Sequence, residues 1–176
     1  MKTAVILTGQ FRSGAYCFPS IKRHILDVLG KPDVFACIAL DADSKGLSDY
    51  APILSEVKEQ EWLDEKNYIH HTAHDGFSLQ SVLQQWKKLE DGFALMERHE
   101  KETGAAYDFV GRLRPDQQFF RDVEHPSTLD PTQCYVPKFH NWWGYNDRFA
   151  IMGRCRADAY FKGFYNLDHY VGNDGM

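Results

Sequence analysis

Apolar positions in the first part of the chain come in unbroken runs and in helical spacing. Residues 4–7 form a continuous apolar run that ends in Thr-Gly-Gln, which predicts a buried strand followed by a turn. Apolar residues recur at helical spacing over residues 21–29, Gly30 and Pro32 end that pattern, and residues 33–40 form a second apolar run. The order strand, helix, strand predicts a β-α-β unit built on parallel strands.

The rest of the chain continues this alternation. From Ser78 onward, apolar residues recur at the spacing of an amphipathic helix that ends near Gly104. The other predicted elements are helices over 52–61 and 156–170 and strands over 68–71, 107–113, 134–136 and 148–152. This order predicts an α/β domain with a mixed, mainly parallel central sheet flanked by helices. A ligand of such a sheet is expected at the carboxyl ends of its strands.

Length and composition point to one domain. The chain has 176 residues, enough for one substantial core, so we expect a single domain over 1–176, and its abrupt end allows for a longer protein. A net charge of -5 makes nucleic acid an unexpected partner. The four cysteines are widely spaced, which favours reduced thiols over a zinc site. Because no apolar segment could span a bilayer and no signal peptide is evident, we expect a cytoplasmic protein.

The segment 107–116 contains the most informative polar residues. If its strand continues, alternation places Arg112, Arg114 and Asp116 on one face at the carboxyl end. Guanidinium groups pair well with phosphate oxygens, and a carboxylate can ligate a divalent cation. The residues therefore suit a site where a diphosphate and a cation meet. The alternative is a structural network of ion pairs at the end of a strand.

A loop rich in aromatic residues follows the short strand over 134–136. Aromatic rings stack on the apolar faces of sugars and amides bond their hydroxyls, so this loop is predicted to hold a sugar. The residues predicted to do so are Trp142, Trp143, Tyr145 and Asn146. Asp147 is a candidate general base for an acceptor hydroxyl. The alternatives are that Asp147 pairs with Arg148 or caps the next element, and that the tryptophans belong to the core.

Two other segments contain residues typical of metal ligands. Asp41-Ala42-Asp43 is a literal DxD string, but it follows the second predicted strand, and we interpret it as a solvated loop. His70, His71 and His74 have a spacing that could bind zinc or manganese, although no HExxH or similar pattern surrounds them. A loop with titrating histidines is the favoured interpretation.

Three segments together resemble a family of GT-A-type glycosyltransferases whose small members occur in large DNA viruses and plants. They are Leu7-Thr8-Gly9-Gln10-Phe11-Arg12, the stretch from Tyr107 to Asp116, and Gly144-Tyr145-Asn146-Asp147-Arg148-Phe149-Ala150. The resemblance covers nearly the whole chain in the right order. It implies a single GT-A-like (Rossmann-like) domain with a nucleotide-binding half over about 1–116 and an acceptor-side half over about 117–176.

The resemblance also implies a reaction. The enzyme would be a hexosyl- or deoxyhexosyltransferase that moves a sugar from a nucleotide-diphosphate sugar, with a UDP-sugar favoured, to a glycan or other hydroxyl acceptor. Asp116 stands at the metal-binding DxD position, where Gln118 replaces the second acid, so Mn²⁺ (or Mg²⁺) is the implied cofactor. Asp122 could be recruited if the loop rearranges.

The remaining implied contacts belong to the donor. The first loop meets the nucleoside through Thr8, Gly9, Gln10 and Arg12, and Arg112 and Arg114 stabilise the diphosphate. Ser81 and Gln85 lie on a polar edge of the long predicted helix, where they could touch the nucleoside, and solvent exposure is the ordinary alternative. Two rival functions stay open. One is a metal-dependent phosphohydrolase or nucleotidyltransferase, and the other is a non-catalytic carbohydrate-binding module.

Overall fold

The computed structural model describes residues 1–65, 78–139 and 146–163. Its centre is a six-stranded sheet in the order β3-β2-β1-β4-β6-β5. The strands are β1 (Thr3–Gln10), β2 (Asp33–Ala39), β3 (Leu54–Lys58), β4 (Phe109–Leu113), β5 (Cys134–Tyr135) and β6 (Phe149–Gly153). The four strands from β3 to β4 run parallel, whereas β6 is antiparallel to β4 and to β5. The predicted mixed, mainly parallel sheet is confirmed.

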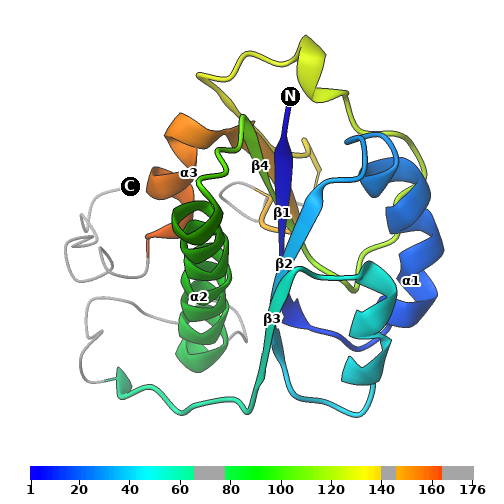
Figure 1. The fold of residues 1–176 in the computed structure, drawn as a ribbon. Coiled ribbons are helices and arrows are strands. Elements are labelled where there is room, and N and C mark those ends of the chain that lie inside the picture. The colour runs from blue at the N-terminus through cyan, green and yellow to red at the C-terminus, as the bar shows by residue number, and fades with distance from the viewer. Residues whose placement is uncertain (66–77, 140–145, 164–176) are drawn as a thin grey trace, which may run out of the picture.

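Helices cover both faces of the sheet. Figure 1 shows α1 (Gly14–Ile21) on one side of the central strands and α2 (Leu79–Thr103) on the other, with α3 (Arg154–Phe161) beside α2. Alternation along β1 supplies both layers: Val5 and Leu7 pack on the α1 side, and Ala4 and Ile6 on the α2 side. A strand buried on both faces needs apolar residues at every position, which explains the unbroken run at the start of the chain.

The long helix α2 agrees with its sequence signals. Ser78 caps its N-terminus, where the Ser78 Oγ accepts a hydrogen bond from the backbone N–H of Ser81 at 3.2 Å, and Gly104 ends it with a left-handed φ of 68°. Gly92 lies against β1, because a Cβ there would come within 2.8 Å of the Ile6 Cγ2 atom. The glycine therefore lets α2 approach the carboxyl half of β1 closely.

Other elements differ from the sequence prediction. The helix predicted over 52–61 is wrong, because its centre is the edge strand β3, paired in parallel with β2. Helix α1 begins at Gly14 rather than near residue 21 and passes into a π-helical turn, Lys22–Leu26, shortly after Pro19 removes a backbone donor. The last helix ends at Phe161, and the strand predicted over 68–71 lies outside the described residues.

Within the described ranges, no helix is both long and apolar enough to cross a membrane.

Candidate functional site

A pocket of about 280 Å³ opens at the carboxyl ends of β1 and β4, next to the first turns of α2. This is the edge where parallel α/β sheets bind their ligands. Its lining is polar and basic: Gly9, Gln10, Arg12, Gln60, Ser81, Gln84, Gln85, Lys88, Arg112 and Arg114. Seven of these ten residues were predicted to bind the donor, whereas Gln60, Gln84 and Lys88 were not.

The turn after β1 forms one wall of the pocket. The Asp41 carboxylate holds this turn, because its Oδ2 accepts hydrogen bonds from the backbone N–H of Phe11 at 3.0 Å and of Arg12 at 3.3 Å. The solvated-loop interpretation of the DxD string therefore misses a structural role for Asp41. Gly9 has a φ of 123°, and a Cβ there would meet no atom within 4 Å, so its backbone faces open space. Thr8, one residue earlier, is buried and does not line the pocket.

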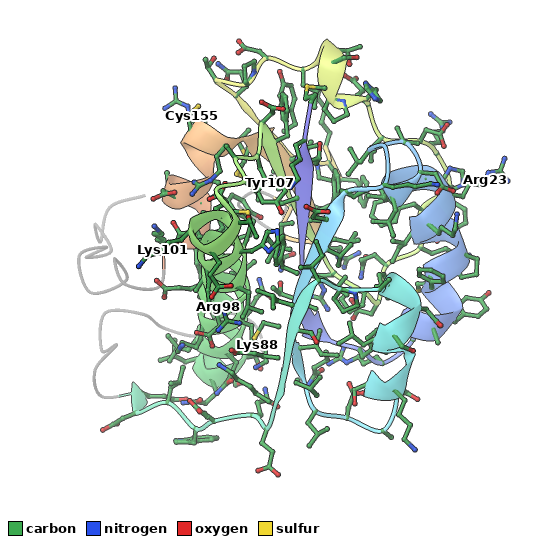
Figure 2. All side chains as sticks on the ribbon, viewed as in Figure 1. Arg23, Lys88, Arg98, Lys101, Tyr107 and Cys155 are labelled. Atoms are coloured by element: carbon green, nitrogen blue, oxygen red, sulfur yellow. The ribbon has the colours of Figure 1, made fainter. Side chains whose placement is uncertain are left out.

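Helix α2 forms the opposite wall. Ser81, Gln84, Gln85 and Lys88 recur at helical spacing and all reach the pocket. Lys88 is only 7% exposed, and Figure 2 labels it on the side of α2 that is turned toward the sheet. Its Nζ donates a hydrogen bond to the Gln84 Oε1 at 3.2 Å. Burial lowers the pKa of Lys88 below its ordinary value, which is the cost of keeping an ammonium group between a helix and a sheet.

Strand β4 supplies the two arginines. Arg112 faces α2 and is 1% exposed, yet neither its Nε nor its Nη1 has a hydrogen-bond partner among the described residues. Buried guanidinium donors are normally paired, because each unmade hydrogen bond costs free energy. Arg114, just past the end of the strand, is partly exposed at the pocket rim. The alternation predicted along residues 107–116 brings both arginines to the pocket, although β4 ends at Leu113 and Asp116 does not line the pocket.

Asp116 lies beside the pocket and does not line it. Its side chain is 8% exposed, and its two oxygens accept hydrogen bonds from the Arg114 Nε at 3.0 Å and the Arg114 Nη2 at 2.8 Å. The Arg12 Nη1 is 3.8 Å from the Asp116 Oδ2. Burial alone would raise the pKa of Asp116, but the hydrogen bonds and charge of Arg114 lower it below the ordinary value. Asp116 is therefore an ionised carboxylate that positions Arg114.

Asp147, like Asp116, contacts side chains that line the pocket without lining it itself. The Gln85 Nε2 donates to the Asp147 Oδ2 at 2.7 Å, and the Nη1 atoms of Arg112 and Arg114 are 3.9 and 4.0 Å from the same oxygen. The side chain is 47% exposed, so its carboxylate is open to solvent. This contact with Gln85 and two arginines stands in place of the Arg148 pair that was the alternative.

The predicted sugar loop is described only at its end. Asn146 is buried, its Nδ2 donates to the Phe139 carbonyl at 2.6 Å, and its Oδ1 accepts from the Arg148 N–H at 2.9 Å. These bonds give Asn146 a role in holding the loop end. Trp142, Trp143 and Tyr145 lie outside the described residues, and so do His70, His71 and His74.

The residues near Asp116 do not fit the metal centre that the resemblance implies. Both Asp116 oxygens are bound by one guanidinium, Gln118 is exposed, and the Asp122 carboxylate pairs with the His24 Nδ1 at 2.6 Å. Across the described ranges, no group of three or more His, Cys, Asp or Glu side chains could hold a metal ion. The expectation of Mn²⁺ or Mg²⁺ stays a prediction.

Comparisons with known proteins place the chain in a family. A family model described as a domain of unknown function, DUF7796, matches residues 1–160, and the chain belongs to that family. No curated protein sequence matches it significantly.

Two solved structures are similar to the chain at low sequence identity. One is a glycosyltransferase involved in the glycosylation of the major capsid of the virus PBCV-1, with 9% identity, a TM-score of 0.43 and coverage of 97% of this chain and 68% of that chain. The other is the mannosyltransferase Ktr4p from S. cerevisiae, with 13% identity, a TM-score of 0.36 and coverage of 72% and 35%. Both likenesses are distant.

Proposed function

We propose that this member of the DUF7796 family is a glycosyltransferase whose pocket between β1, β4 and α2 binds a nucleotide-diphosphate sugar. The observation that carries the proposal is a pocket at the carboxyl end of a parallel sheet with two nearly buried cations, Lys88 and Arg112, on its wall. Among the described residues, Lys88 has no carboxylate partner, and the Nε and Nη1 of Arg112 have no hydrogen-bond acceptor, so a pyrophosphate would supply acceptors that these buried cations lack.

The donor fits the pocket in a definite orientation. The pyrophosphate lies between Lys88, Arg112 and Arg114, and the nucleoside lies toward the β1–α1 turn, where the Gly9 backbone leaves open space. A UDP-sugar is the favoured donor, and the sugar extends toward Asp147. The acceptor is a glycan or another hydroxyl compound.

The transfer step needs a base and a stabilised leaving group. The acceptor oxygen attacks the anomeric carbon, and the bond between that carbon and the phosphate oxygen breaks, with its electron pair leaving on the nucleoside diphosphate. Asp147 takes the acceptor's proton, because its carboxylate is partly exposed and contacts Gln85 and Arg112, which line the pocket. The charge that develops on the departing phosphate is stabilised by the preorganised cations on β4 and α2.

A screen of nucleotide-sugars with simple sugar acceptors tests this proposal. The wild-type protein should release a nucleoside diphosphate and form a glycosylated acceptor, detected by mass spectrometry. Release of inorganic phosphate or of a nucleotidyl product would point to the rival phosphohydrolase or nucleotidyltransferase. Binding of free sugar without any nucleotide affinity would point to a carbohydrate-binding module.

Asp147→Asn tests the assignment of the base. We expect the substitution to lower the transfer rate by about 10²- to 10⁴-fold, as the loss of a general base does, while nucleoside diphosphate binding is retained. Asp49→Asn is the matched control, because Asp49 is an exposed carboxylate on the opposite side of the sheet. A transfer rate that Asp147→Asn leaves unchanged would remove Asp147 from the reaction.

A further inference from the structure

We infer that pyrophosphate binding in this pocket relies on fixed cations of the chain, with Lys88 and Arg112 as the buried contacts, and does not require a divalent metal ion. This inference rests on the proposed function and adds the chemistry by which the donor is held. It assigns a binding role to Lys88, which the sequence patterns did not single out.

Two nitrogens of the Arg112 guanidinium are buried without hydrogen-bond partners in the described ranges. Its side chain is 1% exposed, and its Nε and Nη1 lack hydrogen-bond partners among the described residues. The Asp147 Oδ2 is too distant for a hydrogen bond, at 3.9 Å from the Nη1. Because Arg112 lines the pocket, a phosphate oxygen in the pocket can accept the hydrogen bonds that the folded chain leaves unmade.

Lys88 reaches the pocket from the opposite wall, formed by α2. An ammonium group has three donors, and Lys88 uses one of them on the neutral amide of Gln84. No carboxylate forms a salt bridge with it within the described part of the chain, although its neighbour Lys87 pairs with Asp91. An anion between Lys88 and Arg112 would therefore gain charge-assisted hydrogen bonds from a helix and a strand at once.

The charged side chains that line or contact the pocket carry an excess of positive charge. Four cations line the pocket (Arg12, Lys88, Arg112 and Arg114), and two carboxylates contact them (Asp116 and Asp147), so four minus two leaves two positive charges in excess. Each phosphate of a pyrophosphate bridge in a nucleotide-sugar carries a negative charge. The chain's own side chains therefore neutralise the bridge.

The surroundings of Asp116 fit a divalent metal ion poorly. A divalent cation at Asp116 would have to displace the two hydrogen bonds from Arg114 to the carboxylate. It would also approach a pocket with excess positive charge, which repels it. The donor arrangement fits a bound anion and opposes a bound cation.

Isothermal titration calorimetry on the whole chain tests the inference. UDP, GDP and inorganic pyrophosphate are each titrated in EDTA and, separately, in excess Mn²⁺. We expect at least one nucleoside diphosphate to bind in EDTA with a Kd within about threefold of its value in Mn²⁺, a difference well under a factor of ten or 1.4 kcal/mol. Affinity should fall as salt increases, because the attraction is between charges.

Matched variants identify the contacts. Lys88→Met and Arg112→Met should each weaken binding in EDTA by about tenfold or more, the scale of a hydrogen bond to a charged group. Lys87→Met and Arg98→Met are the controls, since both residues lie on α2 and neither lines the pocket. Lys88 and Arg112 come from different elements, so a variant that fails to fold leaves the other to decide.

Each outcome separates the inference from the proposed function. Nucleoside diphosphate binding that appears only with Mn²⁺ would overturn the inference and leave a glycosyltransferase in place. Binding that survives both Met substitutions would also overturn it. Pyrophosphate binding in EDTA without affinity for any nucleoside diphosphate would support the cation site and count against the proposed donor. If none of the three probes binds in either condition, both proposals fall.

Discussion

The two faces of the sheet differ in how they treat polar groups. On the α1 side, buried residues are almost all apolar, and the Tyr50 hydroxyl there donates to the Gly14 carbonyl at 3.3 Å. The α2 side buries Thr8, Glu90 and Arg112, which together contain every buried side-chain atom without a hydrogen-bond partner among the described residues. The α1 side forms an apolar scaffold, whereas the α2 side contains unpaired buried polar atoms, of which those of Arg112 line the pocket.

Under the proposed function, this difference marks where the fold gives up stability for ligand binding. Unpaired buried polar groups destabilise a fold, and they persist where a ligand uses them. The α1 face therefore should respond to substitution by losing stability. The α2 face should respond by gaining stability or by losing binding.

The largest expected effect is on the scaffold face. Phe11 is fully buried, packs edge-on against Tyr50 and contacts Gly14. We expect Phe11→Ala to lower the free energy of unfolding by about 3–5 kcal/mol, measured by urea denaturation, because it leaves a cavity in a dense core. Tyr16→Ala on the exposed side of α1 is the control and should change it by about 0.5 kcal/mol or less. A small loss for Phe11→Ala would break the contrast between the faces.

Glu90 gives the next largest effect, and the size of that effect depends on pH. Burial raises the pKa of Glu90 from 4.5 to about 7. Between these values the folded state binds more protons than the unfolded state, so the contribution of Glu90 to stability is full below pH 4.5 and is lost as pH rises to about 7. Glu90→Gln removes this loss, and it should stabilise the protein by about 1–3 kcal/mol at pH 8 while changing little at pH 4.

Thermal or urea unfolding from pH 4 to pH 8 measures the Glu90 effect. Glu102→Gln, an exposed carboxylate on the same helix, should show no such trend. A stabilisation by Glu90→Gln that is equal at both ends of the pH range would contradict the burial argument.

Lys88→Met should raise stability even though it is expected to weaken diphosphate binding. Met keeps the length of the side chain and removes a buried charge that lacks a carboxylate partner, so we expect a gain of about 1 kcal/mol at pH 7 in the ligand-free protein. Lys87→Met should instead be neutral or slightly destabilising, because it breaks an ion pair with Asp91. A clear loss of stability in Lys88→Met would make Lys88 a structural residue.

The strongest sequence patterns predicted their elements well. Local sequence patterns were enough to predict β1, β2 and α2. A strand buried on both faces has a continuous apolar run, and a helix buried along one stripe has apolar residues at helical spacing. Strand β3 was mistaken for a helix. It is short and lies at the sheet edge, so its five residues are only half buried and its character comes from pairing with β2.

The site was predictable where it depends on alternation along a strand. Arg112 and Arg114 reach the pocket for that reason, but β4 ends at Leu113 and the chain turns at Pro115, so Asp116 points to Arg114. Gln84 and Lys88 extend the helical spacing of Ser81 as a polar stripe on α2. Such a stripe normally faces solvent, and its burial follows from the sheet end packed against it, which no local pattern contains.

The smallest effect belongs to Arg12, which separates buried from exposed cations within one pocket. Arg12 lines the pocket but its side chain is 62% exposed, so water and salt already screen its charge. We expect Arg12→Met to weaken UDP binding only about two- to fivefold at low salt, the scale of an exposed ion pair, with no change in stability. At high salt the variant and the wild type should converge, whereas Arg112→Met should stay impaired, because burial protects that contact from screening. An Arg12 effect as large and as salt-resistant as that of Arg112 would mean that the ligand covers the β1–α1 turn and buries Arg12 as it binds.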